Sequence, residues 1–135
     1  MNKLINFNNI KNMNIEDYIY NDELSNLLEV IKNDDSCILI DNRNCNPRYD
    51  KSLYKGSQFI AYLVSKNEID LASELISKHK ISLPTSVYEE SCKRGNISGL
   101  IFFIKMGVNV ELSLYNDYKN IFEKAFDIIK LQYNI

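Results

Sequence analysis

Few residues in this chain are of the types that carry out acid–base or nucleophilic chemistry. The only histidine is His79, which lies between two lysines at the expected end of a helix, where positive charge interacts favourably with the helix dipole. Cys92 and Glu90 are the side chains that could serve it as a nucleophile and a base partner. Nothing in their spacing supports such a set, and a free cysteine commonly behaves as a small apolar core residue. We therefore expect no catalytic residues, and a small enzyme that uses His79 is the least favoured hypothesis.

The chain also lacks the ligand spacing of a metal or cofactor site. Zinc sites need clustered cysteine or histidine, and no C-x-x-C spacing occurs among the three cysteines, which are Cys37, Cys45 and Cys92. Asp34, Asp35 and Asp41 lack the alternating oxygen ligands and the glycine of a calcium loop. The run Gly95–Gly99 has no lysine and follows no strand, so it does not match a phosphate-binding loop. We expect neither a metal nor a cofactor.

Length and composition favour one domain over residues 1–135 and a cytoplasmic location. The 135 residues are 45% hydrophobic and carry a net charge of −2, whereas a nucleic-acid-binding protein normally shows a basic surplus. The longest apolar runs, such as Leu100–Ile104, are too short to cross a bilayer, and the N-terminus does not resemble a secretory signal. Three cysteines cannot all pair with one another, and reduced thiols are typical of the cytosol. We therefore expect no nucleic-acid and no membrane partner.

Three stretches of the sequence repeat one pattern: Asp22–Lys32, Asn67–Ser77 and Gly95–Lys105. Each opens with Asp, Asn or Gly, the residues that best tolerate a left-handed backbone between two helices. Each then places apolar residues at helical spacing. The equivalent sets are Leu24/Ile69/Ile97, Leu27/Ala72/Leu100, Val30/Leu75/Phe103 and Ile31/Ile76/Ile104. A recurring helix of this kind is typical of a stacked array, and such arrays usually bind partners.

Other helices are expected around these stretches. The pattern predicts a short helix at Ile15–Tyr20 and another at Phe59–Val64. Ser86 and Glu89 match a capping box, in which each side chain bonds a free backbone N–H of the other residue. Gly107 lies where the end of a helix favours a left-handed residue.

An irregular segment separates the first two repeats. Cys37–Ile40 has the character of a short strand, and Asp41–Arg48 is rich in turn-forming residues and contains a proline. The distance from Leu24 to Ile69 is 45 residues, whereas that from Ile69 to Ile97 is 28. An inserted loop in one repeat explains the difference, and insertions in arrays are often used for binding.

Residues 91–110 resemble an ankyrin repeat in the Lys-Arg-Gly-Asn turn, the apolar second helix and the closing Met-Gly-Val-Asn-Val. Residues 58–77 are similar, with Asn67 in place of the turn glycine, and Asp22–Lys32 matches only in its second helix. The family's opening Thr-Pro-Leu-His is absent. The resemblance implies an all-α fold, a short ankyrin-like stack of helix pairs with an irregular inserted loop and a C-terminal capping helix. It places Cys92 at a small buried position and implies no catalytic residues.

The C-terminal helix has the two faces expected at the end of an array, since the last unit must present a polar face to water. The apolar face comprises Tyr118, Ile121, Phe122, Ala125, Ile128 and Ile129. The polar face carries Lys119, Glu123, Lys124, Asp127 and Lys130.

Charge is unevenly distributed over the first half of the chain. Residues 16–41 contain eight acids and one base, whereas residues 42–66 contain five bases and one acid. A solvated surface is the simpler interpretation; the functional one is an acidic patch that attracts a basic partner. Tyrosine is favoured at interfaces, and two tyrosines lie in the irregular segment. The candidate partner-binding residues are Asp34, Asp35, Asp41, Arg43, Tyr49, Tyr54 and Glu89.

These observations favour a non-catalytic protein-binding module. The more specific hypothesis is a small cytosolic inhibitor, such as a bacterial immunity protein that binds and neutralises a cognate toxin domain. Nuclease toxins tend to be basic because they bind phosphates, so an acidic inhibitor would complement them. The alternative is an ankyrin-type adaptor that engages a host protein.

Overall fold

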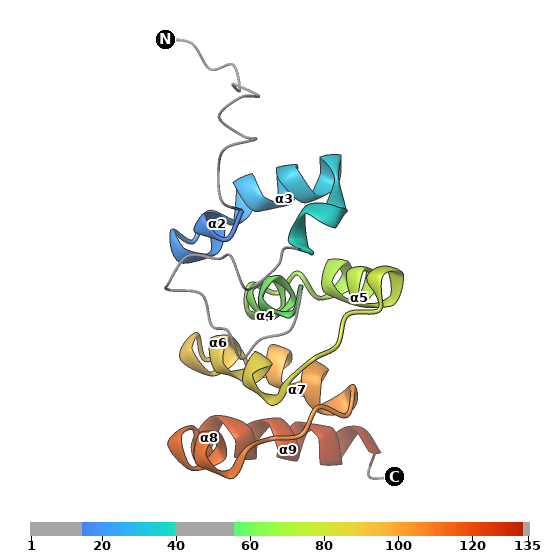
Figure 1. Ribbon diagram of the computed structural model, residues 1–135. Coiled ribbons are helices and arrows are strands. Elements are labelled where there is room, and N and C mark those ends of the chain that lie inside the picture. Colours follow the sequence, from blue (N-terminus) through green and yellow to red (C-terminus); the bar gives the residue numbers. More distant parts are fainter. Residues whose placement is uncertain (1–14, 40–55, 134–135) are drawn as a thin grey trace. The chain divides into compact units, whose positions relative to one another are not determined.

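The described part of the chain is entirely helical. The computed structural model describes residues 15–39 and 56–133, and within these ranges every regular element is an α-helix or a 3-10 helix (Figure 1). The all-α prediction is therefore confirmed for the described residues. The chain divides into two compact units, residues 1–38 and residues 39–135. Each unit is described by itself below, and the single domain expected over residues 1–135 stays a prediction.

The described residues of the first unit form two α-helices and a 3-10 helix. Helix α2 (Asp17–Tyr20) packs against α3 (Leu24–Asn33), and α3 packs against the 3-10 helix η1 (Asp35–Ile38). The predicted strand at Cys37–Ile40 is therefore wrong for Cys37 and Ile38. The reason is local: the carboxylate of Asp34 accepts hydrogen bonds from the Ser36 backbone N–H at 3.1 Å and from its hydroxyl at 2.6 Å, and this bond pattern favours a turn.

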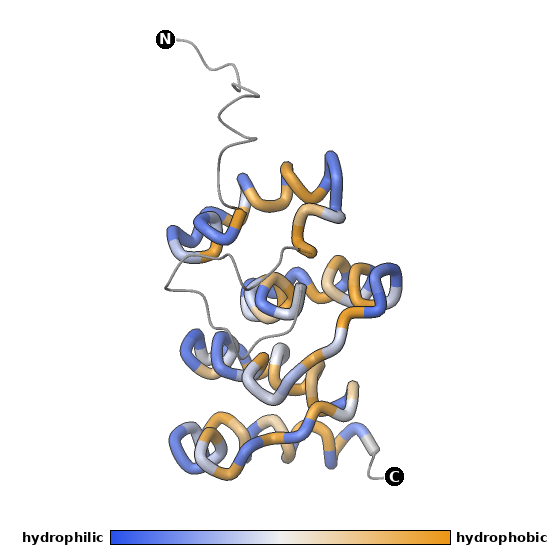
Figure 2. The backbone as a smooth tube through the Cα atoms, in the orientation of Figure 1, coloured by the Kyte–Doolittle hydropathy of each residue, from blue (hydrophilic) through white to orange (hydrophobic). Residues whose placement is uncertain are grey.

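The described residues of the second unit form three consecutive helix pairs. They are α4 (Ser57–Ser65) with α5 (Ile69–His79), α6 (Tyr88–Lys93) with α7 (Ile97–Lys105), and α8 (Leu112–Asp117) with α9 (Lys119–Tyr133). Contacts between pairs run from α4 to α6 and from α7 to α9. Apolar and polar positions alternate along α9 (Figure 2). Its predicted polar face is confirmed, since Lys119, Glu123, Lys124, Asp127 and Lys130 are all exposed.

One turn geometry occurs at the start of each of the three repeated stretches. Asp22, Asn67 and Gly95 have φ values of 55°, 68° and 67°, so each adopts the left-handed conformation that the repeat pattern predicted. In each turn the following N–H bonds the carbonyl oxygen five residues earlier at 2.8 Å. These bonds run from Glu23 to Tyr18, from Glu68 to Leu63 and from Asn96 to Ser91. This is the Schellman pattern, which satisfies carbonyl groups at a helix end.

The residues after these turns are buried at equivalent positions. Leu27, Ala72 and Leu100 are each 0% exposed, as the repeat alignment predicted. The other aligned sets are less regular. Leu24, Ile69 and Ile97 are half-buried, and the two remaining sets mix buried residues (Leu75, Phe103 and Ile31) with half-buried ones (Val30, Ile76 and Ile104). Full burial of these side chains contributes on the order of 25 cal/mol per Å² of apolar surface, so the equivalent positions are major sources of stability.

The core of the second unit is built around aromatic residues. Tyr88 is 0% exposed, and its ring contacts Phe103 and Phe122 edge-on at centroid distances of 5.6 Å.

The predicted capping box at Ser86 and Glu89 is wrong. A 3-10 helix, η3 (Thr85–Val87), shifts the start of α6 to Tyr88, and no side chain caps that helix.

Candidate partner-binding site

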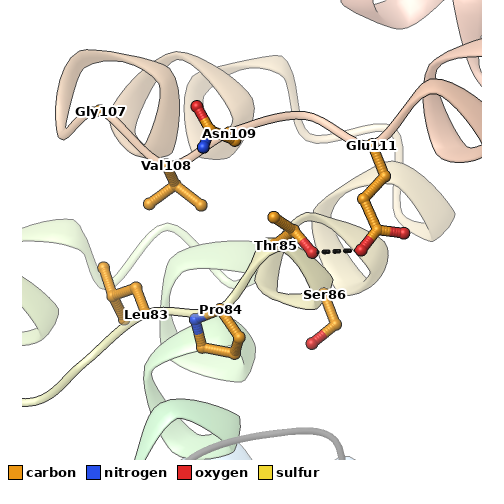
Figure 3. Close-up of a pocket in the computed structure, with 8 residues that line it drawn as sticks. All are labelled: Leu83, Pro84, Thr85, Ser86, Gly107, Val108, Asn109 and Glu111. Carbon is orange, nitrogen blue, oxygen red and sulfur yellow. Dashed lines mark hydrogen bonds between the residues drawn. The ribbon is translucent and has the colours of Figure 1, made fainter.

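Two loops of the second unit form a pocket of about 450 Å³. One loop precedes α6 and contributes Leu83, Pro84, Thr85 and Ser86; the other precedes α8 and contributes Gly107, Val108, Asn109 and Glu111 (Figure 3). Pockets of 300 to 1,000 Å³ are the usual size of ligand sites in proteins, as a rough guide.

The two loops begin with the same backbone geometry. Lys80 ends α5 with φ 53°, and Gly107 follows α7 with φ 87°. The next N–H in each case bonds a carbonyl oxygen five residues earlier, from Ile81 to Ile76 at 3.2 Å and from Val108 to Phe103 at 3.1 Å. The left-handed conformation predicted at Gly107 is therefore confirmed. Equivalent turns at the ends of α5 and α7 direct equivalent loops to the same pocket.

Two side-chain hydrogen bonds hold the second loop, one from Tyr88 at the start of α6 and one from Thr85 of the first loop. The Tyr88 hydroxyl donates to the backbone carbonyl oxygen of Val108 at 2.5 Å. The Thr85 hydroxyl donates to Oε1 of Glu111 at 2.5 Å, across a sequence separation of 26 residues. Because Tyr88 is fully buried, its hydroxyl fixes the second loop to the core. The burial of Tyr88 and its proximity to Cys92 raise the pKa of the phenol, so the hydroxyl remains a donor at physiological pH.

The lining of the pocket combines an apolar wall with oxygen acceptors. Leu83, Pro84 and Val108 supply the apolar part, and Figure 3 shows Glu111 reaching back toward Thr85 from the opposite loop. The hydroxyl oxygen of Ser86 is buried and has no hydrogen-bond partner among the described groups. Buried polar atoms of this kind usually have a partner, so an unpartnered one is a feature to be explained.

The predicted partner-binding residues fall in different parts of the chain. Asp34, which precedes η1 in the first unit, is exposed, and Asp35, the first residue of η1, is half-buried. Glu89 is exposed on α6 in the second unit, where it forms an ion pair of 3.6 Å with Lys93. The four remaining candidates lie outside the described residues: Asp41, Arg43, Tyr49 and Tyr54.

Two of these placements change the interpretation of the residues. Asp34 has a local structural role, because its carboxylate holds the turn at Ser36. The ion pair of Glu89 is between solvent-exposed groups, and such pairs contribute only about 0–1 kcal/mol to stability. Glu89 is thus available at the surface at little cost to the fold. One acid of the charged stretch, Glu16, is only 3% exposed and adds little to a surface patch.

The residues considered for chemistry are placed as core or helix-end residues. His79 is the last residue of α5, at the expected helix terminus. Cys92 is 2% exposed, and its burial, together with the nearby Glu89 carboxylate, raises the pKa of its thiol to about 12. The nucleophilic form of cysteine is the thiolate, and at pH 7 this thiol stays protonated.

The described ranges also lack two kinds of feature. Within residues 15–39 and 56–133, no three or more His, Cys, Asp or Glu side chains gather where they could hold a metal ion. In the same part of the chain, no helix has the length and apolar character needed to cross a membrane.

The residues of the pocket carry little signal in the sequence. The pattern marks Gly107 only as a helix end, and it marks neither Thr85 nor Glu111 as a site residue. The available signal was the equivalence of the two loops, which follow consecutive repeats and begin with left-handed residues.

Comparison of the chain with models of protein families, with curated proteins and with solved structures finds no match.

Proposed function

We propose that this chain is a non-catalytic protein-binding module with the architecture of a short ankyrin-like stack. Its function would be that of a small cytoplasmic inhibitor, such as an immunity protein that binds and neutralises a basic, nuclease-type toxin domain. The geometry described above and the charge distribution of the sequence support this proposal from different directions.

The recurring turn is the observation that carries the proposal. Asp22, Asn67 and Gly95 share a left-handed φ, and the same 2.8 Å hydrogen bond follows each of them. Leu27, Ala72 and Leu100 are buried at the corresponding positions. Repeated units with equivalent hydrogen bonds and equivalent core positions are typical of helical arrays, whose extended surfaces bind other proteins.

Charge supports a basic partner. The acids of the first unit that lie at the surface include Asp22, Glu29 and Asp34, which are exposed, and Asp35, which is half-buried. Complementary charge accelerates association and disfavours partners of the same sign. A nuclease domain must bind phosphates and is therefore a suitable class of basic partner.

Affinity capture tests this proposal. The tagged chain is used to capture partners from cells of its own source, and the captured protein is assayed for degradation of DNA and RNA with and without the chain. We expect a basic protein whose nuclease activity is lost in the complex. Capture of a protein without nuclease activity would contradict the inhibitor hypothesis and would favour an adaptor.

A further inference from the structure

We propose that the pocket between residues 83–86 and 107–111 receives a lysine or arginine side chain of the protein partner, with Glu111 as its counter-ion. This inference rests on the proposed function, because it assigns a contact site for a basic partner. It concerns residues that the charge pattern of the sequence did not single out.

The shape of the pocket suits a long cationic side chain. Lysine and arginine bury their aliphatic stems against apolar surface and keep the charged group near polar atoms. Leu83, Pro84 and Val108 provide the apolar surface, and the carboxylate of Glu111 lies at the polar end. The volume of about 450 Å³ exceeds that of one side chain, so the pocket also admits the peptide backbone on either side.

The charge of the pocket selects a cation. Among the described residues of the lining, Glu111 is the only one of a charged type, and its carboxylate gives the pocket a formal negative charge. The Thr85 hydroxyl bonds Oε1 of Glu111 and thereby orients the carboxylate. An ionised carboxylate has about four acceptor sites on its two oxygens, so one bond from Thr85 leaves capacity for an ammonium or a guanidinium group.

A second acceptor supports the same orientation of the ligand. The side chain of Asn109 also lines the pocket, and its amide oxygen can accept a hydrogen bond from the backbone of a bound peptide. An anionic ligand would instead face the Glu111 carboxylate, and like charges repel.

The test uses short peptides and backbone amide chemical shifts. The ¹⁵N-labelled full chain is titrated with acetyl-Ala-Arg-Ala-amide, with the lysine equivalent, and with the citrulline equivalent, which has the shape of arginine without its charge. We expect the amides of Thr85, Ser86 and Gly107–Glu111 to shift with the two cationic peptides, and at least a tenfold weaker effect with citrulline.

Two variants make the test specific. Glu111→Gln retains the oxygen that accepts from Thr85 but removes the charge, so it should abolish the preference for cationic peptides. Glu74→Gln removes one charge from an exposed position on α5 and should leave the titration unchanged. Equal weakening by both variants would show a general effect of net charge and would overturn the proposal. The absence of shifts at about 10 mM peptide would also overturn it, because that concentration is tenfold above a weak dissociation constant of about 1 mM.

The same variants separate this proposal from the proposed function. If the captured partner binds Glu111→Gln as tightly as the wild-type chain, the pocket is not its contact site, although the inhibitor function stands. If the peptides bind as expected and no basic partner is captured, the pocket stands as a cation-binding site and the inhibitor function fails.

Discussion

Asn96 donates a hydrogen bond of 2.8 Å from Nδ2 to the backbone carbonyl oxygen of Ser65, the last residue of α4. The same amide group bonds Oδ1 of Asn67 at 3.0 Å, and Oδ1 of Asn96 caps α7 by accepting from the Gly99 N–H at 3.0 Å. One side chain therefore satisfies the end of α4 and the start of α7. It connects two of the three equivalent turns.

Replacement of Asn96 by Asp should destabilise the fold although the cap is retained. The carboxylate still accepts from Gly99, but it cannot donate and it brings negative charge next to the Ser65 carbonyl oxygen. Loss of a buried hydrogen-bond partner costs about 1–3 kcal/mol, and the free energy of unfolding in denaturant should fall by this amount. Asn120→Asp, the same change at an exposed position of α9, is the control and should have little effect. Equal stability of the two variants would contradict the connecting role of Asn96.

Replacement of Gly99 by Ala should destabilise α7 although alanine favours helix. A Cβ atom at this position would lie 3.1 Å from Cβ of Ser91 and 3.1 Å from Cγ1 of Val64, with the Ser91 hydroxyl oxygen closer still. Overpacking costs about 1–3 kcal/mol, which exceeds the gain of about 0.8–1 kcal/mol in helix propensity. Thermal or denaturant unfolding measures the difference.

The double variant Gly99→Ala, Ser91→Ala tests the cause of that effect. The Ser91 hydroxyl is buried without a hydrogen-bond partner among the described groups, so its removal alone should cost little. In the double variant the closest clash is gone. A double-mutant cycle should therefore show a smaller loss of stability than the sum of the losses in the two single variants. Strict additivity of the two changes would show that Ser91 does not restrict the space at Gly99.

Alkaline pH should destabilise the protein in part through Cys92. Burial raises the pKa of this thiol from 9.0 to about 12, so the folded state favours the protonated form. This contribution is complete below pH 9, the unfolded pKa, and is lost as the pH rises from 9 to 12. The free energy of unfolding of the wild-type chain should fall with pH in this range. Cys92→Ala should show a shallower fall, and an unchanged slope would contradict the assignment.

The acidic residues of the first unit and the following segment should contribute to partner binding. Asp34→Asn, Asp35→Asn and Asp41→Asn together remove three charges, and the amide oxygen at position 34 can still accept the bonds from Ser36. We expect slower association with a basic partner, and a difference from wild type that shrinks as salt is raised, because exposed charges are screened over about 10 Å at 0.1 M. Surface plasmon resonance at several salt concentrations measures this. Unchanged association rates at low salt would remove these residues from the binding site.

Local chemistry made the helices and turns predictable from the sequence. Asp22, Asn67 and Gly95 are residue types that tolerate a left-handed backbone, and a helix with apolar positions at regular spacing follows each. The polar outer face of α9 was predictable for the same reason, because alternation along one helix is a local property.

Features that depend on packing between elements were not predictable. The hydrogen bond from Thr85 to Glu111 joins residues of two loops, and only the packing of consecutive helix pairs brings them together. The capping box at Ser86 failed because the 3-10 helix before α6 competes with the helix start. Within a predicted buried stripe, Phe103 is fully buried whereas Ile104 is only half-buried, since the exact rotation of α7 depends on its neighbours.

We propose that the chain inhibits a basic nuclease-type protein by binding it. Titration of the captured partner with the purified chain tests this directly, with the remaining nuclease activity recorded at each molar ratio. We expect a linear loss of activity that ends at one chain per partner molecule, with both proteins in one complex by size-exclusion chromatography. Full nuclease activity in the presence of an equimolar, bound chain would contradict it.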